Sequence, residues 1–171
     1  MNTRLAAATL ALCALALPAR AADAPKLDVF AGYSFLKFAE ESRHGWEASA
    51  AWNVFGKLGF VADLAGHYKG EFDDLSYLGG VRYALHGDKL TPFVRVLAGG
   101  LRDRSSVHVL GVTISESSNH FAWAAGGGFS YRFSEHWEAR VQGDYFNVKI
   151  EETNEGNPRF AAGVAYRFGR R

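Results

Sequence analysis

Apolar and polar residues alternate along most of the chain, and the alternation is clearest between Asn119 and Lys149. The stretch FAWAAGGGFSYRF has its aromatic residues at odd positions, and so does WEARVQGDY after a short SEH turn. A period of two over about ten residues predicts a hairpin of two β-strands, each with one apolar face. The opposite face holds Ala, Gly and Ser with a few Arg, Glu and Asp, which suits a narrow barrel interior better than a surface in water.

The same alternation predicts six further strands. The eight expected ranges are 27–35, 46–54, 58–68, 75–85, 91–101, 121–133, 137–145 and 160–168. Short connections (FGK, HGDK and SEH) follow every second strand, and longer polar loops follow the others. This division into short turns and long loops is typical of outer-membrane barrels, whose short turns face the periplasm. VHVLGVTI in the longest loop also alternates, which predicts that this hairpin continues beyond the membrane.

Aromatic residues gather near both ends of the expected strands. Near the long loops these are Trp46, Tyr68, Tyr77, Phe121 and Tyr145, and near the short turns Trp52, Tyr83, Phe133, Trp137 and Phe168. Such belts mark the two interfaces of a membrane. Beyond the N-terminal segment no apolar run is long enough for a membrane helix, and a closed barrel is the other structure that satisfies its backbone in lipid. We therefore expect an all-β, eight-stranded antiparallel up-and-down transmembrane β-barrel. A soluble barrel of the lipocalin type, with the aromatic face inside, is the alternative.

The N-terminal segment has the features of a cleavable signal peptide. Arg4 precedes an apolar run from Leu5 to Leu17, which is too short to span a bilayer. Ala19-Arg20-Ala21 then matches a small-residue cleavage site, so we expect residues 1–21 to be the signal peptide and 22–171 the barrel domain. An uncleaved anchor is the alternative.

Composition excludes several classes of function. Without residues 1–21 the chain keeps 17 of its 19 basic residues and all 18 acidic ones, a net charge of −1 with no basic patch for nucleic acid. The one cysteine, Cys13, lies in the segment that is removed, so neither a disulfide nor a cysteine-based metal site is expected. The histidines show no metal-ligand spacing, and no cofactor is predicted.

Three stretches, VFAGYSFLKF, TPFVRVLAGG and FAAGVAYRF, resemble the small outer-membrane β-barrel family related to the OmpA transmembrane domain. The resemblance covers nearly the whole chain after residue 21. It implies export through the periplasm to the bacterial outer membrane, where outer-membrane lipids and lipopolysaccharide are the partners. In this family the barrel assembly machinery reads the last strand through a Gly-x-x-aromatic-x-aromatic pattern, which Gly163, Tyr166 and Phe168 match.

Strand parity directs a balanced set of charges into the barrel. The expected interior network is Asp28, Glu47, Asp63, Arg82, Arg95, Arg132, Glu138, Arg140, Asp144 and Arg167. Buried charges have to be paired or solvated, so the set predicts a structural network that fills the lumen. A small-solute pore is the alternative, but eight strands leave an interior just wide enough for side chains.

A lipid A-modifying enzyme is the other alternative. Glu116, Ser118 and His120 alternate near the outer mouth and could supply a nucleophile and a base. In the deacylases among related barrels a late strand carries His-x-Ser, and the corresponding stretch Asp144-Tyr145-Phe146-Asn147 has neither residue. We therefore predict a non-enzymatic barrel with an envelope-structural or surface-interaction role through its extracellular loops.

The long loops are expected to be acidic and solvated. Their carboxylates are Glu40, Glu41, Glu71, Asp73, Asp74, Glu151, Glu152 and Glu155. They could also hold divalent cations that bridge to lipopolysaccharide phosphates. The extended hairpin could bind a partner by strand addition, although the sequence does not identify that partner.

Overall fold

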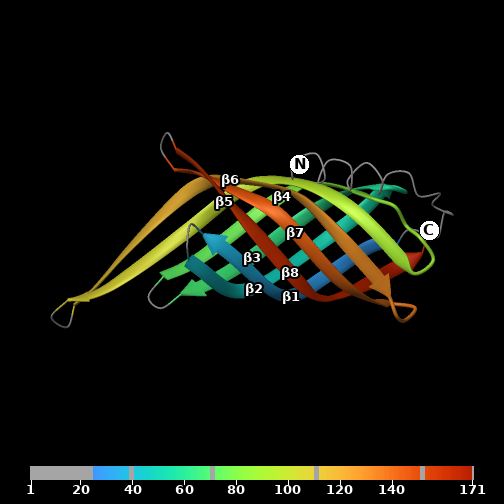
Figure 1. Cartoon of the computed structure of the whole chain (residues 1–171), viewed down its shortest axis with the longest axis horizontal. Coiled ribbons are helices and arrows are strands. Elements are labelled where there is room, and N and C mark those ends of the chain that lie inside the picture. Colours follow the sequence, from blue (N-terminus) through green and yellow to red (C-terminus); the bar gives the residue numbers. More distant parts are fainter. Residues whose placement is uncertain (1–24, 39–40, 70–71, 110–111, 151–152, 171) are drawn as a thin grey trace, which may run out of the picture.

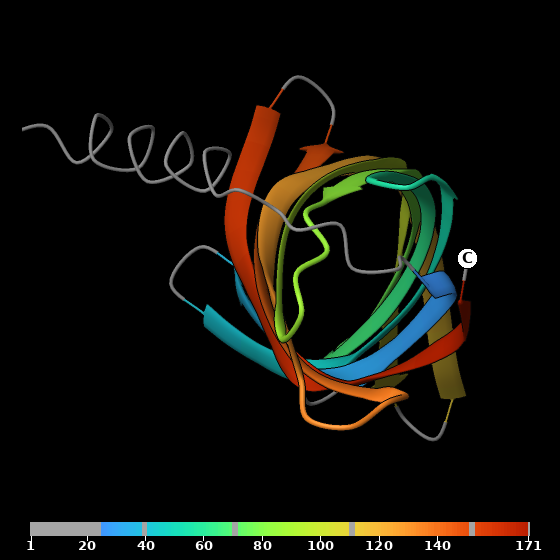
Figure 2. The same cartoon turned by 90° about the vertical axis from the view of Figure 1, so that its right-hand side faces the viewer.

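The structure, a computed structural model, describes residues 25–38, 41–69, 72–109, 112–150 and 153–170. Eight antiparallel strands close into one barrel in sequence order, which confirms the predicted fold (Figures 1 and 2). The strands are β1 Pro25–Phe38, β2 Glu41–Phe55, β3 Leu58–Lys69, β4 Phe72–Ala84, β5 Leu90–Val109, β6 Val112–Arg132, β7 Trp137–Ile150 and β8 Thr153–Arg170. The predicted signal peptide, residues 1–21, lies outside the described residues.

The alternation in the sequence becomes a division between the lumen and the outer wall. In β7, for example, Val141 is 55% exposed, whereas its neighbours Arg140 and Gln142 are 4% and 5% exposed. Successive side chains of a strand point to opposite faces, so one parity of each strand lines the lumen. The apolar parity faces outward, as predicted, and this excludes the soluble alternative with the aromatic face inside.

The strands are strongly staggered around the barrel. Following the paired residues once around from Trp137 leads back to β7 at Asn147, ten residues farther along the same strand. The path runs through Tyr166, Val29, Ala50, Ala62, Gly79, Ala98 and Trp123. With eight strands, this stagger gives a strand tilt of about 40° and a backbone radius of roughly 8 Å. Side chains alone can fill a lumen of that width.

The two ends of the barrel differ. At one end, here called the turn end, residues 56–57, 85–89 and 133–136 connect the strands, and both Pro25 and Arg170 lie there. Gly56 adopts φ 62° in the two-residue turn, a conformation that glycine tolerates without strain. In Figure 2 the yellow-green connection between β4 and β5 crosses the opening at this end.

At the opposite end, here called the hairpin end, the predicted long loops are mostly strand. Only two residues separate the strands at each of the four connections there, 39–40, 70–71, 110–111 and 151–152. An antiparallel ladder can continue in water because its backbone groups stay paired, so a polar sequence does not have to end a strand. The longest extension is the β5–β6 hairpin, which projects beyond its neighbours in Figure 1, and the described residues of VHVLGVTI continue its two strands as the alternation predicted.

The outer wall is apolar and carries aromatic residues toward both ends. Trp46, Tyr77, Phe121 and Tyr145 are 39–55% exposed toward the hairpin end, and Trp52, Tyr83, Phe133, Trp137 and Phe168 are 36–62% exposed toward the turn end. The side chain of Tyr68 lies outside the described residues. The described part of the chain holds no helix with the length and apolarity needed to span a bilayer.

Candidate functional site

The lumen is the most chemically distinctive part of the described structure. Five carboxylates and five guanidinium groups, none more than 7% exposed, meet there in two clusters. The turn-end cluster consists of Asp28, Arg82, Glu138, Arg140 and Arg167. The central cluster consists of Glu47, Asp63, Arg95, Asp144 and Arg159. Each cluster joins strands that are distant in the sequence.

In the turn-end cluster, Asp28 of β1 binds two guanidinium groups from opposite sides of the barrel. Arg82 of β4 donates to both carboxylate oxygens of Asp28, with a distance of 3.0 Å to Oδ1. Arg140 of β7 donates from Nη2 to Oδ1 at 2.7 Å. Glu138 lies 3.2 Å from Nε of Arg167 and 3.8 Å from Nη2 of Arg140. Three bases therefore face two acids in this cluster.

In the central cluster, two guanidinium groups are shared among three carboxylates. Arg95 of β5 donates to Glu47 at 2.8 Å and to Asp63 at 3.1 Å, and it forms two hydrogen bonds with Asp144. Arg159 of β8 donates to Asp63 at 3.1 Å and to Asp144 at 2.9 Å. Guanidinium groups suit this arrangement because their fixed donors can serve several carboxylates at once. The acid excess here balances the base excess of the turn-end cluster.

Apolar side chains complete the filling of the lumen. Phe30 and Phe146 are at most 1% exposed, and Phe93 is 6% exposed. Arg140 lies over the rings of both Phe30 and Phe93, at 5.5 and 5.4 Å, and Arg159 lies 5.4 Å from the ring of Phe146. These cation–π contacts bring the charged and aromatic layers together. The described interior is therefore a packed core in which the ionic clusters occupy much of the space.

Nine of the ten charges that parity directed inward lie in these clusters. Arg132 does not: its guanidinium donates to the backbone carbonyl of Gly87 at 2.9 Å and to that of Asp88, in the turn between β4 and β5. Arg159 takes its place, because β8 begins at Thr153 rather than at the predicted residue 160. Arg159 has the same strand parity as Arg167, so alternation would have directed its side chain into the lumen. The preceding Asn157-Pro158 instead favoured a loop at this position.

A third polar group lies toward the hairpin end of the lumen. The hydroxyl of Ser34 is 2.9 Å from Nε2 of His67, and Arg43 forms a salt bridge with Asp74. Asp74 is opposite His67 in the β3–β4 register. Asp74 was predicted to be a solvated loop residue; it lies instead in β4 and is 5% exposed. Ser34 and His67 are 0% and 2% exposed, so no substrate reaches this serine–histidine pair in the described conformation.

The predicted catalytic alternative falls on the extended part of β6. Ser118 is exposed and His120 is half-buried, opposite Asp103 and Leu101 of β5. The side chains of Glu116 and of most predicted acidic loop residues lie outside the described residues. No cluster of His, Cys, Asp and Glu able to hold a metal ion occurs in the part of the chain that could be searched.

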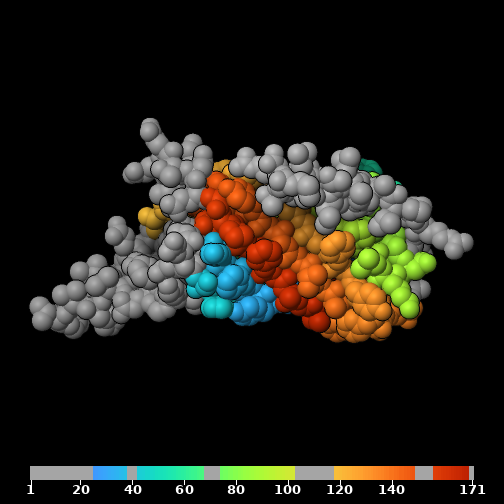
Figure 3. Space-filling view, in the orientation of Figure 1, coloured from blue at the N-terminus to red at the C-terminus, as the bar shows by residue number. Residues whose placement is uncertain are grey.

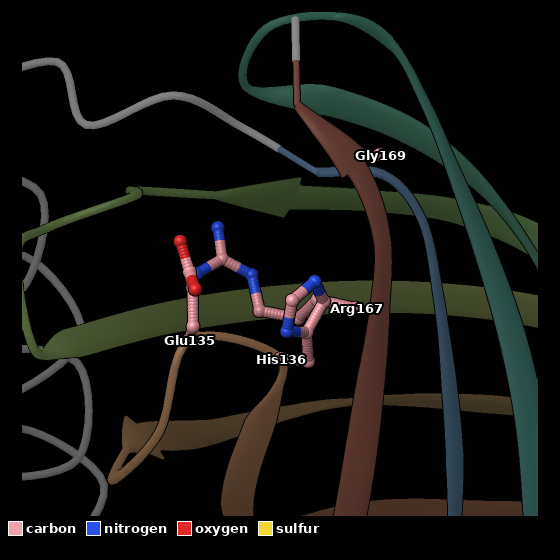
Figure 4. A pocket seen from close by; sticks show the side chains of 4 residues that line it. All are labelled: Glu135, His136, Arg167 and Gly169. Carbon is pink, nitrogen blue, oxygen red and sulfur yellow. The ribbon is translucent and has the colours of Figure 1, made fainter.

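A pocket of about 280 Å³ lies at the turn end, lined by Glu135, His136, Arg167 and Gly169 (Figure 4). His136 stacks on Tyr166 of β8 at 5.7 Å, and Tyr166 contacts Phe168 edge-on at 4.6 Å. Gly163, the first residue of the predicted assembly signal, lies opposite Gly32 of β1. The pocket lining holds a carboxylate and an imidazole but no serine, threonine or cysteine, so it lacks the hydroxyl or thiol of a Ser/His/acid set.

Comparison with known proteins identifies one family. The family profile described as outer membrane protein beta-barrel domain matches residues 5–168. Among curated proteins, none matches the chain.

Solved structures share the fold at low sequence identity. Neisserial surface protein A is 18% identical, with a TM-score of 0.61 over 83% of this chain and 96% of that one. The N-terminal β-barrel domain of Pseudomonas aeruginosa OprF is 12% identical, with a TM-score of 0.58 over 84% and 98%. Ail, the attachment invasion locus protein of Yersinia pestis, is 14% identical, with a TM-score of 0.56 over 83% and 96%. At these identities the likeness establishes the fold.

Proposed function

Since this chain belongs to the outer membrane protein beta-barrel domain family, we propose that it is a non-enzymatic barrel with an envelope-structural or surface-interaction role. The observation that carries the proposal is the filled lumen. Five carboxylates, five guanidinium groups and three phenylalanine rings occupy an interior that eight strands leave only wide enough for side chains. The small-solute pore is the weaker alternative, because a solute would have to displace these paired charges.

The hairpin end supports the surface-interaction part of the proposal. The β4–β5 pairing ends at Phe72 and Ser105, and the β6–β7 pairing at Phe121 and Lys149. The β5–β6 ladder continues to Val109 and Val112. Residues 112–120 of β6 therefore pair with β5 alone, and at roughly 3.4 Å per residue this part of the strand is about 30 Å long. A two-stranded ribbon with free edges can add a strand from a partner.

The pore alternative is tested by electrical recording. Folded protein recovered from outer membranes would be reconstituted into planar lipid bilayers. We expect no stable conductance steps, because the clusters leave no continuous aqueous path. The double variant Arg95→Ala with Asp144→Ala, which removes two side chains of the central cluster, is the positive control, because its emptier lumen should conduct more readily. A defined, ion-selective conductance of the wild-type protein would reject the filled-lumen proposal.

The enzyme alternative is tested by the mass of lipid A from cells that express the protein. We expect the same lipid A species with wild-type protein, with Ser118→Ala and without the protein. Ser34→Ala tests the buried serine–histidine pair in the same way, and it too should leave the lipid A species unchanged. A change in lipid A mass that requires either hydroxyl would overturn the non-enzymatic assignment. Cell fractionation and the gel shift between unboiled and boiled samples would confirm that each variant is a folded outer-membrane barrel.

A further inference from the structure

The outer wall of β1 and β2 carries a group of aromatic and basic side chains toward the hairpin end. Tyr33, Trp46 and Phe160 of the neighbouring β8 are 55%, 39% and 57% exposed. Lys37 and His44 are exposed farther toward the hairpin end. Figure 3 shows the described parts of β1 and β2, in blue to cyan, beside those of β8 on this face of the molecule. The order along the wall is therefore an aromatic belt and then positive or hydrogen-bonding groups.

The local geometry orients the imidazole of His44. Its Nδ1 is hydrogen-bonded to the hydroxyl of Tyr33, and its ring packs edge-on against Phe35 at 5.4 Å. When the hydroxyl donates to Nδ1, Nε2 carries the hydrogen and is a donor toward an outside ligand. Phe35 pairs with His44 and Lys37 with Ser42, so Lys37 and His44 are diagonal neighbours on the same face. An ammonium group and an imidazole N–H can therefore reach one anion.

The basic side chains near the hairpin end lie on different sides of this wall, with Lys37 exposed on the outside and Arg43 directed toward the lumen. Arg43, between Ser42 and His44, belongs to the lumen side and forms its salt bridge with Asp74 there. Among the described side chains of β8, β1, β2 and β3 on the outer wall at this level, none is a carboxylate. Lys37 thus has no competing acid on the described outer face. An anionic group just beyond the aromatic belt would complement it.

We propose that this face, the Lys37–His44 site, binds a phosphate group of the lipid A headgroup of lipopolysaccharide. Aromatic belts lie at the level of the headgroups, so a cation just beyond the belt meets the phosphates of the outer leaflet. Lys37 supplies the charge and His44 a hydrogen bond from Nε2, while Tyr33, Trp46 and Phe160 contact the sugars and acyl chains. The proposal rests on the outer-membrane location and is independent of the role proposed for the β5–β6 ribbon.

Binding of labelled, doubly phosphorylated lipid A to the folded full chain in neutral phosphatidylcholine nanodiscs tests the proposal. Lys37→Glu should weaken binding by about fivefold or more, because a basic residue near an anionic surface contributes to binding by roughly that factor. His44→Phe keeps the ring packing against Phe35 but removes the Nε2 donor, and a smaller loss is expected. Lys57→Glu is the matched control, because this exposed lysine lies in the turn between β2 and β3, at the opposite end of the barrel.

Two further ligands distinguish the sources of phosphate. Lipid A lacking its phosphates should bind wild-type protein and Lys37→Glu equally, and inorganic phosphate should compete only weakly. Equal binding of doubly phosphorylated lipid A by wild-type protein and Lys37→Glu would overturn the proposal, and so would equal losses with Lys37→Glu and Lys57→Glu. Efficient competition by inorganic phosphate would reject the lipid-bound ligand. Outer-membrane fractionation and heat-dependent migration of the same samples report separately on the barrel, so loss of this site leaves the proposed function standing.

Discussion

Replacing Arg159 with alanine tests the energetics of the central cluster. Its guanidinium lies 3.1 Å from Asp63, 2.9 Å from Asp144 and 3.7 Å from Glu47, and the residue is 1% exposed. The wild-type cluster has one carboxylate more than it has guanidinium groups. Arg159→Ala raises this excess to two and removes the cation over Phe146. Breaking a buried ion pair from one side costs about 3–5 kcal/mol, because the remaining charge stays buried without its partner.

The free energy of unfolding would be measured by urea titration of the barrel in lipid vesicles, followed by tryptophan fluorescence. Arg132→Ala is the matched control, because Arg132 is half-buried and donates to turn carbonyls rather than to buried carboxylates. Its loss should cost about 1–2 kcal/mol, because two hydrogen bonds of roughly 0.5–1.5 kcal/mol each are lost and no buried charge is left without its partner.

A second substitution checks the physical cause. Asp63→Asn in the Arg159→Ala background lowers the carboxylate excess to its wild-type value, so part of the lost stability should return. The two substitutions should therefore be non-additive, as expected for groups in direct contact. Equal costs for Arg159→Ala and Arg132→Ala, or simple additivity of the double variant, would refute the buried-charge reasoning.

Three further predictions follow from the turns, glycines and last strand. Gly99→Ala should strongly reduce the yield of folded barrel, because an added Cβ would meet the backbone of Tyr77 and Leu78. Gly100→Ala should cost only roughly 1 kcal/mol of stability, because its Cβ would meet the movable ring of Tyr77. Heat-dependent gel migration and urea unfolding measure both variants, and equal yields of folded barrel would contradict the expected difference. Burial, with a contribution from Arg82, lowers the pKa of His86 in the β4–β5 turn to about 4 from its usual 6.5. The unfolded chain then binds the proton more readily, so stability should fall as pH drops from about 6.5 toward 4, and between pH 7 and 5 the wild type should lose on the order of 1–2 kcal/mol more than His86→Gln; parallel pH profiles would exclude this contribution. Phe168→Ala should lower the outer-membrane level of folded barrel and raise periplasmic degradation, as quantitative blots of fractions would show, and unchanged levels would mean that this residue is not read during assembly.

At the hairpin end, the local sequence was not enough to predict where the strands begin and end. The segments around Glu41 and Asn154 are polar and acidic, which favoured loops, yet both lie in paired strands. Their strand conformation depends on a neighbouring strand in register, and composition does not report that partner. For the same reason β8 was predicted to start too late, and Arg159 was missed.

Alternation alone was enough to predict the number of strands, their order, the apolar outer wall and the inward direction of nine charges, because the two-residue period of a strand is a local property. Which charges meet was decided by the tertiary structure. Arg95 of β5 and Arg159 of β8 share Asp63 of β3 because closure with a stagger of ten residues brings distant strands to one level of the lumen. Likewise, Arg132 lies opposite Glu138 in the β6–β7 register, yet its guanidinium donates to Gly87 and Asp88 of the β4–β5 turn, which only the folded barrel brings within its reach. The parity of a residue within its strand decides whether its side chain faces the lumen or the outer wall. Barrel closure decides its level along the barrel axis.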